Sequence, residues 1–512
     1  MSNRHPFIAA VLASLVAIAT ATPAFAEGAA NPVEMQDSEA AYKKGDYKTA
    51  IAILRILAAQ GNALAQFRLG HMLAEGKGEE QNLPLAAEWL QKSADQGHDG
   101  ALTLLGRMYL NGTGVKEDAG KAATLLMSGA EKGNKTAQFY IGKLYRQGLG
   151  VKKNPAAAVP WLLAAAREEV VEAQFELGSI YATGDGVTKD LAAAEAWLLR
   201  AAGNGLVAAQ YTLASNYARG SGFAKDINKA VEWYEKAAKA GLVSAQRELG
   251  GIYMEGLEGK PDHAKALNWF RQAADNKDPV SQSNLAYMYA TGTGTAKDES
   301  EAAKLYELAS ERGYVPAQTA LALFYETGRG VEQDNVKASY WYRTAAAAGN
   351  EAAAGRLGEM LVDGRVKVDG NENAPRWIAA AAANGLKSAL DWLRSAAAAG
   401  DHEAQFRLSG LLSSGKGVQT DADKALALLR DSAEGGVTAA QLALAKRLAT
   451  GDGVSQDYVA AHKWANLAAI GGGEEAIKMR ETFANLMTPD QVADAQRQVR
   501  AWIAKNKNMQ AD

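Results

Sequence analysis

The side chains of this sequence that could carry chemistry are six histidines, a recurring series of aspartates and a set of glycine pairs. A metal site on one helix face needs two ligands four residues apart. We expect none of the histidines to have such a partner, so we predict exposed single histidines and no metal. The glycine pairs, such as Gly184-Asp185-Gly186, resemble fragments of phosphate-binding loops but lack a preceding strand and a Lys-Ser/Thr partner. The aspartates recur in one register, which indicates helix caps and not catalytic acids.

Composition sets the class of protein. The chain has 512 residues, with 55 Lys and Arg against 58 Asp and Glu and no cysteine. The missing thiols exclude disulfides, zinc–thiolate sites and iron–sulfur clusters. A near-neutral charge argues against a dedicated nucleic-acid binder, which needs a basic surface to neutralise phosphates. Abundant alanine and few β-branched residues favour a mostly helical protein.

The strongest pattern is a repeating unit of 36 residues marked by an Ala-Gln pair. We call the second residue of the pair position 0. An aliphatic residue follows at +3 in all eleven copies. A fixed period in the thirties is typical of a solenoid, whose units bury apolar surface against their neighbours. Position 0 falls on Gln66, Leu102, Gln138, Gln174, Gln210, Gln246, Gln282, Gln318, Ala354, Gln405 and Gln441.

Each unit resolves into two predicted helices. A small residue at −1, an aliphatic residue at +3 and, in most copies, Tyr at +7 form one apolar stripe along the first helix. A glycine at +10 in every copy, such as Gly148, suits a left-handed C-cap. An Asp or Asn at +16, such as Asp190, predicts the N-cap of the second helix. That second helix carries a large apolar residue, usually Trp.

One unit, from Ala208 to Ala238, follows the pattern A-x-A-Q-x-x-L-G-x-x-Y-x-x-G-x-G-V-x-x-D-x-x-K-A-x-x-W-x-x-x-A-A with small departures. This pattern resembles the Sel1-like repeat family, a branch of the tetratricopeptide-type helical solenoids, over about residues 62–473. The resemblance implies an all-α fold, a right-handed superhelical solenoid of about eleven helix-turn-helix repeats. Some members that bind or hydrolyse penicillin carry paired cysteines in each repeat, and this chain has none.

The segments outside the regular repeats predict the rest of the organisation. Residues 1–26 are predicted to be a cleaved secretory signal, with Arg4, an apolar run and an A-x-A motif before Glu27. The repeat period breaks at residues 386–400, where we expect a degenerate fused repeat with a kink or one merged helix. The remaining predicted segments are a flexible linker (27–38), N-terminal capping helices (39–61), repeats one to nine (62–385), repeats ten and eleven (401–473) and C-terminal capping helices (474–512).

The first helices carry the candidate binding residues. Positions −1, +3 and +7 face the core, so +1, +5 and +8 are free to meet a ligand, and the resemblance implies that these helices line the concave face of the solenoid. Aromatic and basic side chains together are typical of a hot spot for an acidic or extended peptide. The alternative is that the aromatic rings pack between neighbouring first helices. The candidate residues are Phe67, Arg107, Phe139, Lys143, Arg146, Phe175 and Tyr211.

The sequence therefore predicts an exported scaffold or adaptor, periplasmic or secreted, with no enzyme activity and no cofactor. We expect a protein or peptide partner, no nucleic acid, and no membrane insertion after signal cleavage. The resemblance implies a role in envelope regulation or assembly, such as signalling, exopolysaccharide or cell-wall machinery. Two alternatives stay open: an enzyme that acts on peptidoglycan or a β-lactam, and a repeat protein that binds glycans through exposed aromatic rings.

Overall fold

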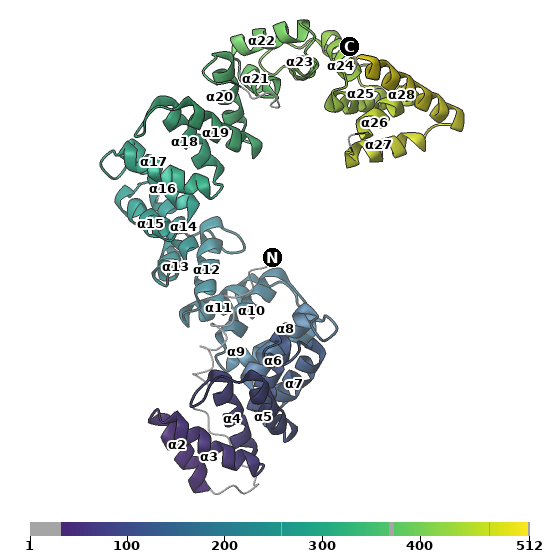
Figure 1. Ribbon diagram of the computed structural model, residues 1–512. Coiled ribbons are helices and arrows are strands. Elements are labelled where there is room, and N and C mark those ends of the chain that lie inside the picture. Colours follow the sequence, from purple (N-terminus) through teal and green to yellow (C-terminus); the bar gives the residue numbers. More distant parts are fainter. Residues whose placement is uncertain (1–31, 258, 368–372, 471, 510–512) are drawn as a thin grey trace. The chain divides into compact units, whose positions relative to one another are not determined.

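The computed structural model describes residues 32–257, 259–367, 373–470 and 472–509, in which twenty-seven α-helices follow one another (Figure 1). An isolated β-bridge joins Leu257 to Lys260 in one loop. The predicted all-α solenoid of helix-turn-helix repeats is confirmed. The predicted signal peptide at residues 1–26 lies outside the described residues.

The chain divides into two compact units, with the boundary between Ala245 and Gln246. Unit one contains α2 (Pro32–Lys43), α3 (Tyr47–Ala59), α4 (Ala63–Glu75), α5 (Leu83–Asp95), α6 (Asp99–Asn111), α7 (Ala119–Glu131), α8 (Lys135–Gln147), α9 (Pro155–Arg167), α10 (Val171–Thr183), α11 (Leu191–Gly203), α12 (Val207–Arg219) and α13 (Ile227–Lys239). Helix α14 (Val243–Glu255) begins just before the boundary.

Unit two continues with α15 (His263–Asp275), α16 (Pro279–Thr291), α17 (Glu299–Glu311), α18 (Val315–Thr327), α19 (Asn335–Ala347), α20 (Glu351–Val362), α21 (Ala374–Ala383), α22 (Lys387–Ala398), α23 (His402–Ser414), α24 (Ala422–Glu434), α25 (Thr438–Thr450), α26 (Tyr458–Ala469), α27 (Glu474–Ala484) and α28 (Pro489–Met509). Helices α4 and α5 are the first and second helix of repeat one, and the pairs continue in chain order to α20 and α21 of repeat nine. Helices α23 to α26 form repeats ten and eleven.

Single residues determine where the repeat helices begin and end, as predicted. The side chain of Asp190 accepts a hydrogen bond from the backbone N–H of Ala193 at 2.9 Å, and the Asp or Asn at +16 of nine other repeats caps its helix in the same way. Gly148 ends α8 with a φ of 77°, and its N–H donates to the carbonyl of Leu144. A Cβ is strained at that φ, which explains the glycine.

The core of each repeat lies between its two helices. In repeat three, Ala137 and Ile141 on α8 and Leu162 on α9 have no exposed surface. Burial of a side chain of the size of Ile or Leu stabilises the fold by about 1.5–3 kcal/mol. The helices approach closely because position +4 is small. A Cβ on Gly142 would lie 2.7 Å from Cγ of Leu162. A larger residue there would force the helices of the repeat apart.

The second glycine of the loop packs against the preceding repeat. A Cβ on Gly150 would lie 1.9 Å from the carbonyl oxygen of Ala119, the first residue of α7. A Cβ on Gly330 in unit two would lie 2.0 Å from the carbonyl oxygen of Glu299, the first residue of α17. Backbone meets backbone at these junctions, so only glycine permits the observed spacing between repeats.

The marker glutamine joins its own helix to the preceding second helix. The Nε2 of Gln66 donates to the carbonyl of Ala58 at 3.0 Å, and that of Gln174 donates to Ala166 at 3.2 Å. These acceptors belong to the last turn of a helix, where carbonyls have no partner within the helix. Because the glutamines are buried, they serve the fold and are not free to bind a ligand.

Three segments depart from the regular repeat. Residues 32–38 were expected to belong to a flexible linker but form the first part of α2. Ser38 on that helix is buried and donates to the carbonyl of Ala50 on α3 at 3.3 Å, so packing extends the N-terminal cap. At residues 386–400 there is a single helix, α22, which packs against α21 and α23. Helices α27 and α28 cover the end of the last repeat by packing on α26.

Candidate protein-binding surface

Four of the seven candidate residues keep exposed surface on the first helices of unit one and form no ion pair with any residue that the structure describes. They are Phe67 on α4, Lys143 on α8, Phe175 on α10 and Tyr211 on α12. Phe67 stacks on the imidazole of His98 with ring centroids 4.6 Å apart, which fixes the ring while leaving part of it open. Each of these four side chains is therefore able to contact a partner.

Arg107 and Phe139, in contrast, are only 6% and 8% exposed. The guanidinium of Arg107 on α6 lies 5.1 Å from the ring centroid of Tyr140, and Tyr140 meets Phe139 edge-on at 5.2 Å. The ammonium of Lys143 lies 5.5 Å from the Phe139 ring. The contact of Arg107 with Tyr140 joins α6 to α8. Phe139 itself is buried in a cluster with residues of α9 and α10, so it packs against the next first helix, as the alternative interpretation expected. Sequence analysis did not single out Tyr140, whose only signal is an aromatic side chain at +2.

Arg146 forms an ion-pair bridge between repeats three and four. Its guanidinium pairs with Glu176 on α10 and donates through Nε to Asp185 in the next glycine loop at 2.9 Å. Burial disfavours the charged form, but the two carboxylates outweigh it and raise the pKa of Arg146. Arg146 is therefore occupied by the fold and is less available to a partner than the sequence suggested.

Unit two contains the same bridge with the charges exchanged. Glu326 at +8 of repeat eight pairs with Arg356 at 3.0 Å and Arg365 at 2.6 Å in repeat nine. The partners follow the central residue by 30 and 39 residues in both bridges. Tyr342 donates to the second oxygen of Glu326 at 2.8 Å. Burial raises the pKa of Glu326, but the arginines and Tyr342 outweigh burial and lower it.

The histidines differ from the expectation of exposed single residues. Among the described histidines only His402 is exposed, and His462 is 3% exposed. His71 has a partner one turn along its helix, because its Nδ1 lies 3.5 Å from Glu75. Burial lowers the pKa of His71, Glu75 opposes this effect, and Lys77 and Arg107 add to it. No third ligand joins the pair: the described residues hold no group of three His, Asp or Glu placed to bind a metal.

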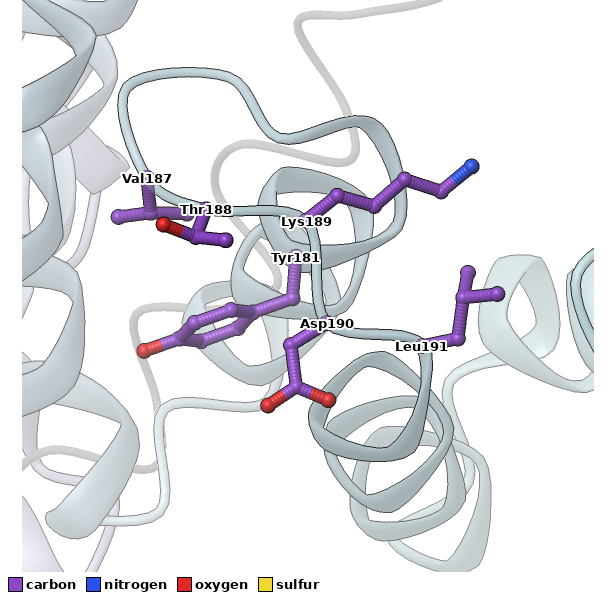
Figure 2. Close-up of a pocket in the computed structure, with 6 residues that line it drawn as sticks. All are labelled: Tyr181, Val187, Thr188, Lys189, Asp190 and Leu191. Carbon is purple, nitrogen blue, oxygen red and sulfur yellow. The ribbon is translucent and has the colours of Figure 1, made fainter.

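A shallow hollow lies at the glycine loop of repeat four (Figure 2). It is lined by Tyr181 on α10, by Val187, Thr188 and Lys189 in the loop, and by Asp190 and Leu191 at the start of α11. Figure 2 shows Lys189 extending away from the ring of Tyr181. Asp190 is engaged as the cap of α11, so the hollow offers mainly apolar surface beside a free lysine.

Within the ranges that the structure describes, no helix is long and apolar enough to span a membrane. A search of curated proteins found no significant match to this sequence. Solved structures do resemble it. A protective antigen of uropathogenic Escherichia coli strains that displays an SLR fold is 31% identical, with a TM-score of 0.60 over 89% of this chain and 94% of that one. A Sel1 repeat protein from Oxalobacter formigenes is 32% identical, with a TM-score of 0.43 over 48% of this chain and 97% of that one.

The sequence pattern of the Sel1 repeat matches eleven times. The matched segments are residues 63–98, 100–134, 135–169, 171–206, 207–242, 243–278, 279–314, 315–350, 352–401, 402–437 and 438–473. The ninth match is the longest and contains the extra helix α22. Because these matches cover most of the chain and agree with the helix pairs of the structure, the chain belongs to the Sel1 repeat family.

Proposed function

We propose that this protein is an exported scaffold that binds a protein partner through the exposed residues of its first helices. Solenoids of Sel1 repeats typically mediate protein–protein interactions. One observation carries the choice of surface. The framework positions −1 and +3 are buried in unit one, whereas +1 and +5 vary between repeats and include accessible side chains at Phe67, Lys143, Phe175 and Tyr211. Variable exposed positions on a rigid framework are suited to recognising one partner.

A pair of substitutions tests this surface. Lys143→Glu with Phe175→Ala removes an accessible charge and an accessible ring but spares the buried Phe139 and the bridging Arg146. The matched control is Lys132→Glu with Leu199→Ala, which alters exposed residues at the end of α7 and on α11. Cross-linked pull-downs from the native envelope, read by mass spectrometry, should recover one salt-resistant partner with the wild type and the control and at least tenfold less with the first pair. Equal capture by all three proteins would contradict the proposal.

The proposal includes export and a role without catalysis, in envelope signalling, exopolysaccharide or cell-wall assembly. The A-x-A motif before Glu27 supports export, and the likeness to a protective antigen agrees with an exported protein. The recurrent polar residues support a non-catalytic role because they act as caps and as helix-to-helix hydrogen bonds. N-terminal sequencing of the mature protein should begin at Glu27, and purified protein should leave peptidoglycan and β-lactams intact. Turnover of either would refute the non-catalytic role.

A further inference from the structure

Unit one has a line of unpaired lysines on the loops between first and second helices. Seven basic residues and no acidic residue lie between Glu131 and Glu168, which makes repeat three unusually basic. Two of the seven, Lys152 and Lys153, are exposed in its glycine loop, and Lys189 and Lys225 occupy the +15 position of the next two repeats. We call Lys152, Lys153, Lys189 and Lys225 the loop-edge lysines. Among the described residues, none of the four forms an ion pair or a side-chain hydrogen bond.

The same position serves the fold in other repeats. Gln81, Gln333 and Gln456 stand at +15 and donate to a carbonyl of their own first helix at 2.7–2.9 Å. Lys297 at +15 of repeat seven pairs with Glu299 at 3.0 Å. Other repeats therefore use the +15 side chain for internal contacts, whereas repeats three to five leave it unpaired. Repeat seven shows that a lysine at this position is able to pair with a glutamate two residues later.

Nearby acidic groups do not neutralise this edge. The carboxylates next to the lysines, Asp190 and Asp226, accept hydrogen bonds from backbone N–H groups at 2.9 and 3.0 Å. They face the positive ends of α11 and α13, which offset their charge. Asp185, the other acid of these loops, is paired with Arg146. The ammonium groups are therefore the charges that remain for an external partner.

We propose that the loop-edge lysines bind an extended acidic segment of a protein partner. This inference rests on the proposed adaptor function and names the chemistry of the partner. Lys153, Lys189 and Lys225 stand at the same position of three successive repeats, so their charges recur along one edge of unit one. An extended segment, which advances about 3.3 Å per residue, meets them in turn when it carries acidic residues at regular intervals. The hollow of Figure 2, with Tyr181, Val187 and Leu191, lies beside Lys189 and accepts an apolar side chain of the same segment.

Fluorescence anisotropy with synthetic peptides tests the inference. The probe is a labelled peptide of about fifteen residues with Glu at every third position, a central Leu, and Ser or Thr elsewhere. The wild type should bind it, and sodium chloride should weaken binding because exposed charges are screened. The variant Lys153→Gln with Lys189→Gln and Lys225→Gln should bind about tenfold more weakly, since it loses three exposed charge pairs. The control Lys44→Gln with Lys48→Gln and Lys132→Gln makes the same charge change at other exposed sites and should bind like the wild type.

Three results would overturn the inference. The first is binding of a peptide with Gln in place of Glu as tightly as the acidic peptide. The second is equal loss of binding in the two triple variants. The third is equally tight binding of an oligonucleotide of the same charge, which would show a general anion surface. Partner capture separates the two proposals. If the loop-edge variant captures the partner normally while Lys143→Glu with Phe175→Ala does not, the adaptor function stands and the loop-edge inference falls.

Discussion

The paired bridges around Arg146 and Glu326 make a quantitative prediction about the junction between repeats three and four. The side chains of Arg146, Glu176 and Asp185 are 23%, 20% and 35% exposed. An exposed ion pair contributes about 0.2–1 kcal/mol, and breaking a buried one costs about 3–5 kcal/mol. Arg146→Glu breaks two pairs of intermediate exposure and brings three carboxylates together, so we expect it to destabilise unit one by about 2–3 kcal/mol.

Exchanging all the charges should rescue the junction. Unit two already accommodates a central glutamate with two arginines at the same repeat positions. Arg146→Glu combined with Glu176→Arg and Asp185→Arg should therefore return to within about 1 kcal/mol of the wild type. In a domain of this size, 1 kcal/mol corresponds to about 2–4 °C in the unfolding midpoint, so the single variant should melt about 4–12 °C lower than the wild type.

Thermal unfolding followed by circular dichroism measures these shifts. Hydrogen exchange locates them, because a solenoid is coupled mainly between neighbours, so protection should fall around α8 and α10 and not near α2. A single variant as stable as the wild type would show that the bridge contributes nothing. A triple variant no more stable than the single would show that the repeat positions in the two units are not equivalent.

Three further predictions follow from single positions. Gly250→Ala should destabilise unit two by about 1–3 kcal/mol because the new Cβ would lie 2.5 Å from the Phe270 ring. A Cβ at Gly251 would meet no atom within 4 Å, so Gly251→Ala should stabilise unit two by about 0.5–1 kcal/mol. Thermal unfolding measures both effects. Glu169 has a φ of 61° where most other repeats have glycine, so Glu169→Gly should stabilise unit one by about 1 kcal/mol in urea unfolding. The folded pKa of Glu326 is lowered, so its stabilisation is present above its ordinary value of about 4.3 and is lost as pH falls through the folded pKa. Glu326→Gln should therefore destabilise unit two near neutral pH, and the gap should narrow in unfolding curves taken from about pH 6 to pH 3.

Opposite results would contradict these arguments in different ways. Equal effects of alanine at Gly250 and Gly251 would show that helix packing does not control position +4. A destabilised Glu169→Gly protein would mean that the glutamate side chain contributes more than its backbone strain costs. A gap between wild type and Glu326→Gln that stays constant with pH would show that the ionised carboxylate is not the stabilising form.

The sequence was sufficient to predict those parts of the structure that depend on local patterns. The glycine at +10 and the Asp or Asn at +16 predicted helix ends that the structure confirms, because caps are formed within a few residues. Contacts between repeats were harder to predict. Phe139 and Phe175 occupy the same repeat position, yet Phe139 is buried in a cluster with residues of α9 and α10 while Phe175 keeps exposed surface. Burial of such residues depends on side chains one repeat away, which a single unit does not reveal.

The bridges show a signal that sequence analysis could have used. Charged residues at +8 of one repeat and at +2 and +11 of the next are complementary at Arg146 and again, with opposite sign, at Glu326. Comparing charges at offsets of 30 and 39 residues would have assigned Arg146 to the fold. The extra length of α2 had no comparable signal, since its packing depends on the buried contact of Ser38 with α3.

Site-specific photo-cross-linking tests the central claim most directly, because it reports which face of the solenoid touches a partner in the cell. A photoreactive phenylalanine analogue is placed at Phe175 on the first helix of repeat four or at Leu199 on its second helix, both of which have exposed surface. The adaptor account predicts that position 175 yields one abundant adduct and that position 199 does not. An adduct from 199 with none from 175 would contradict the claim that the first helices form the binding surface.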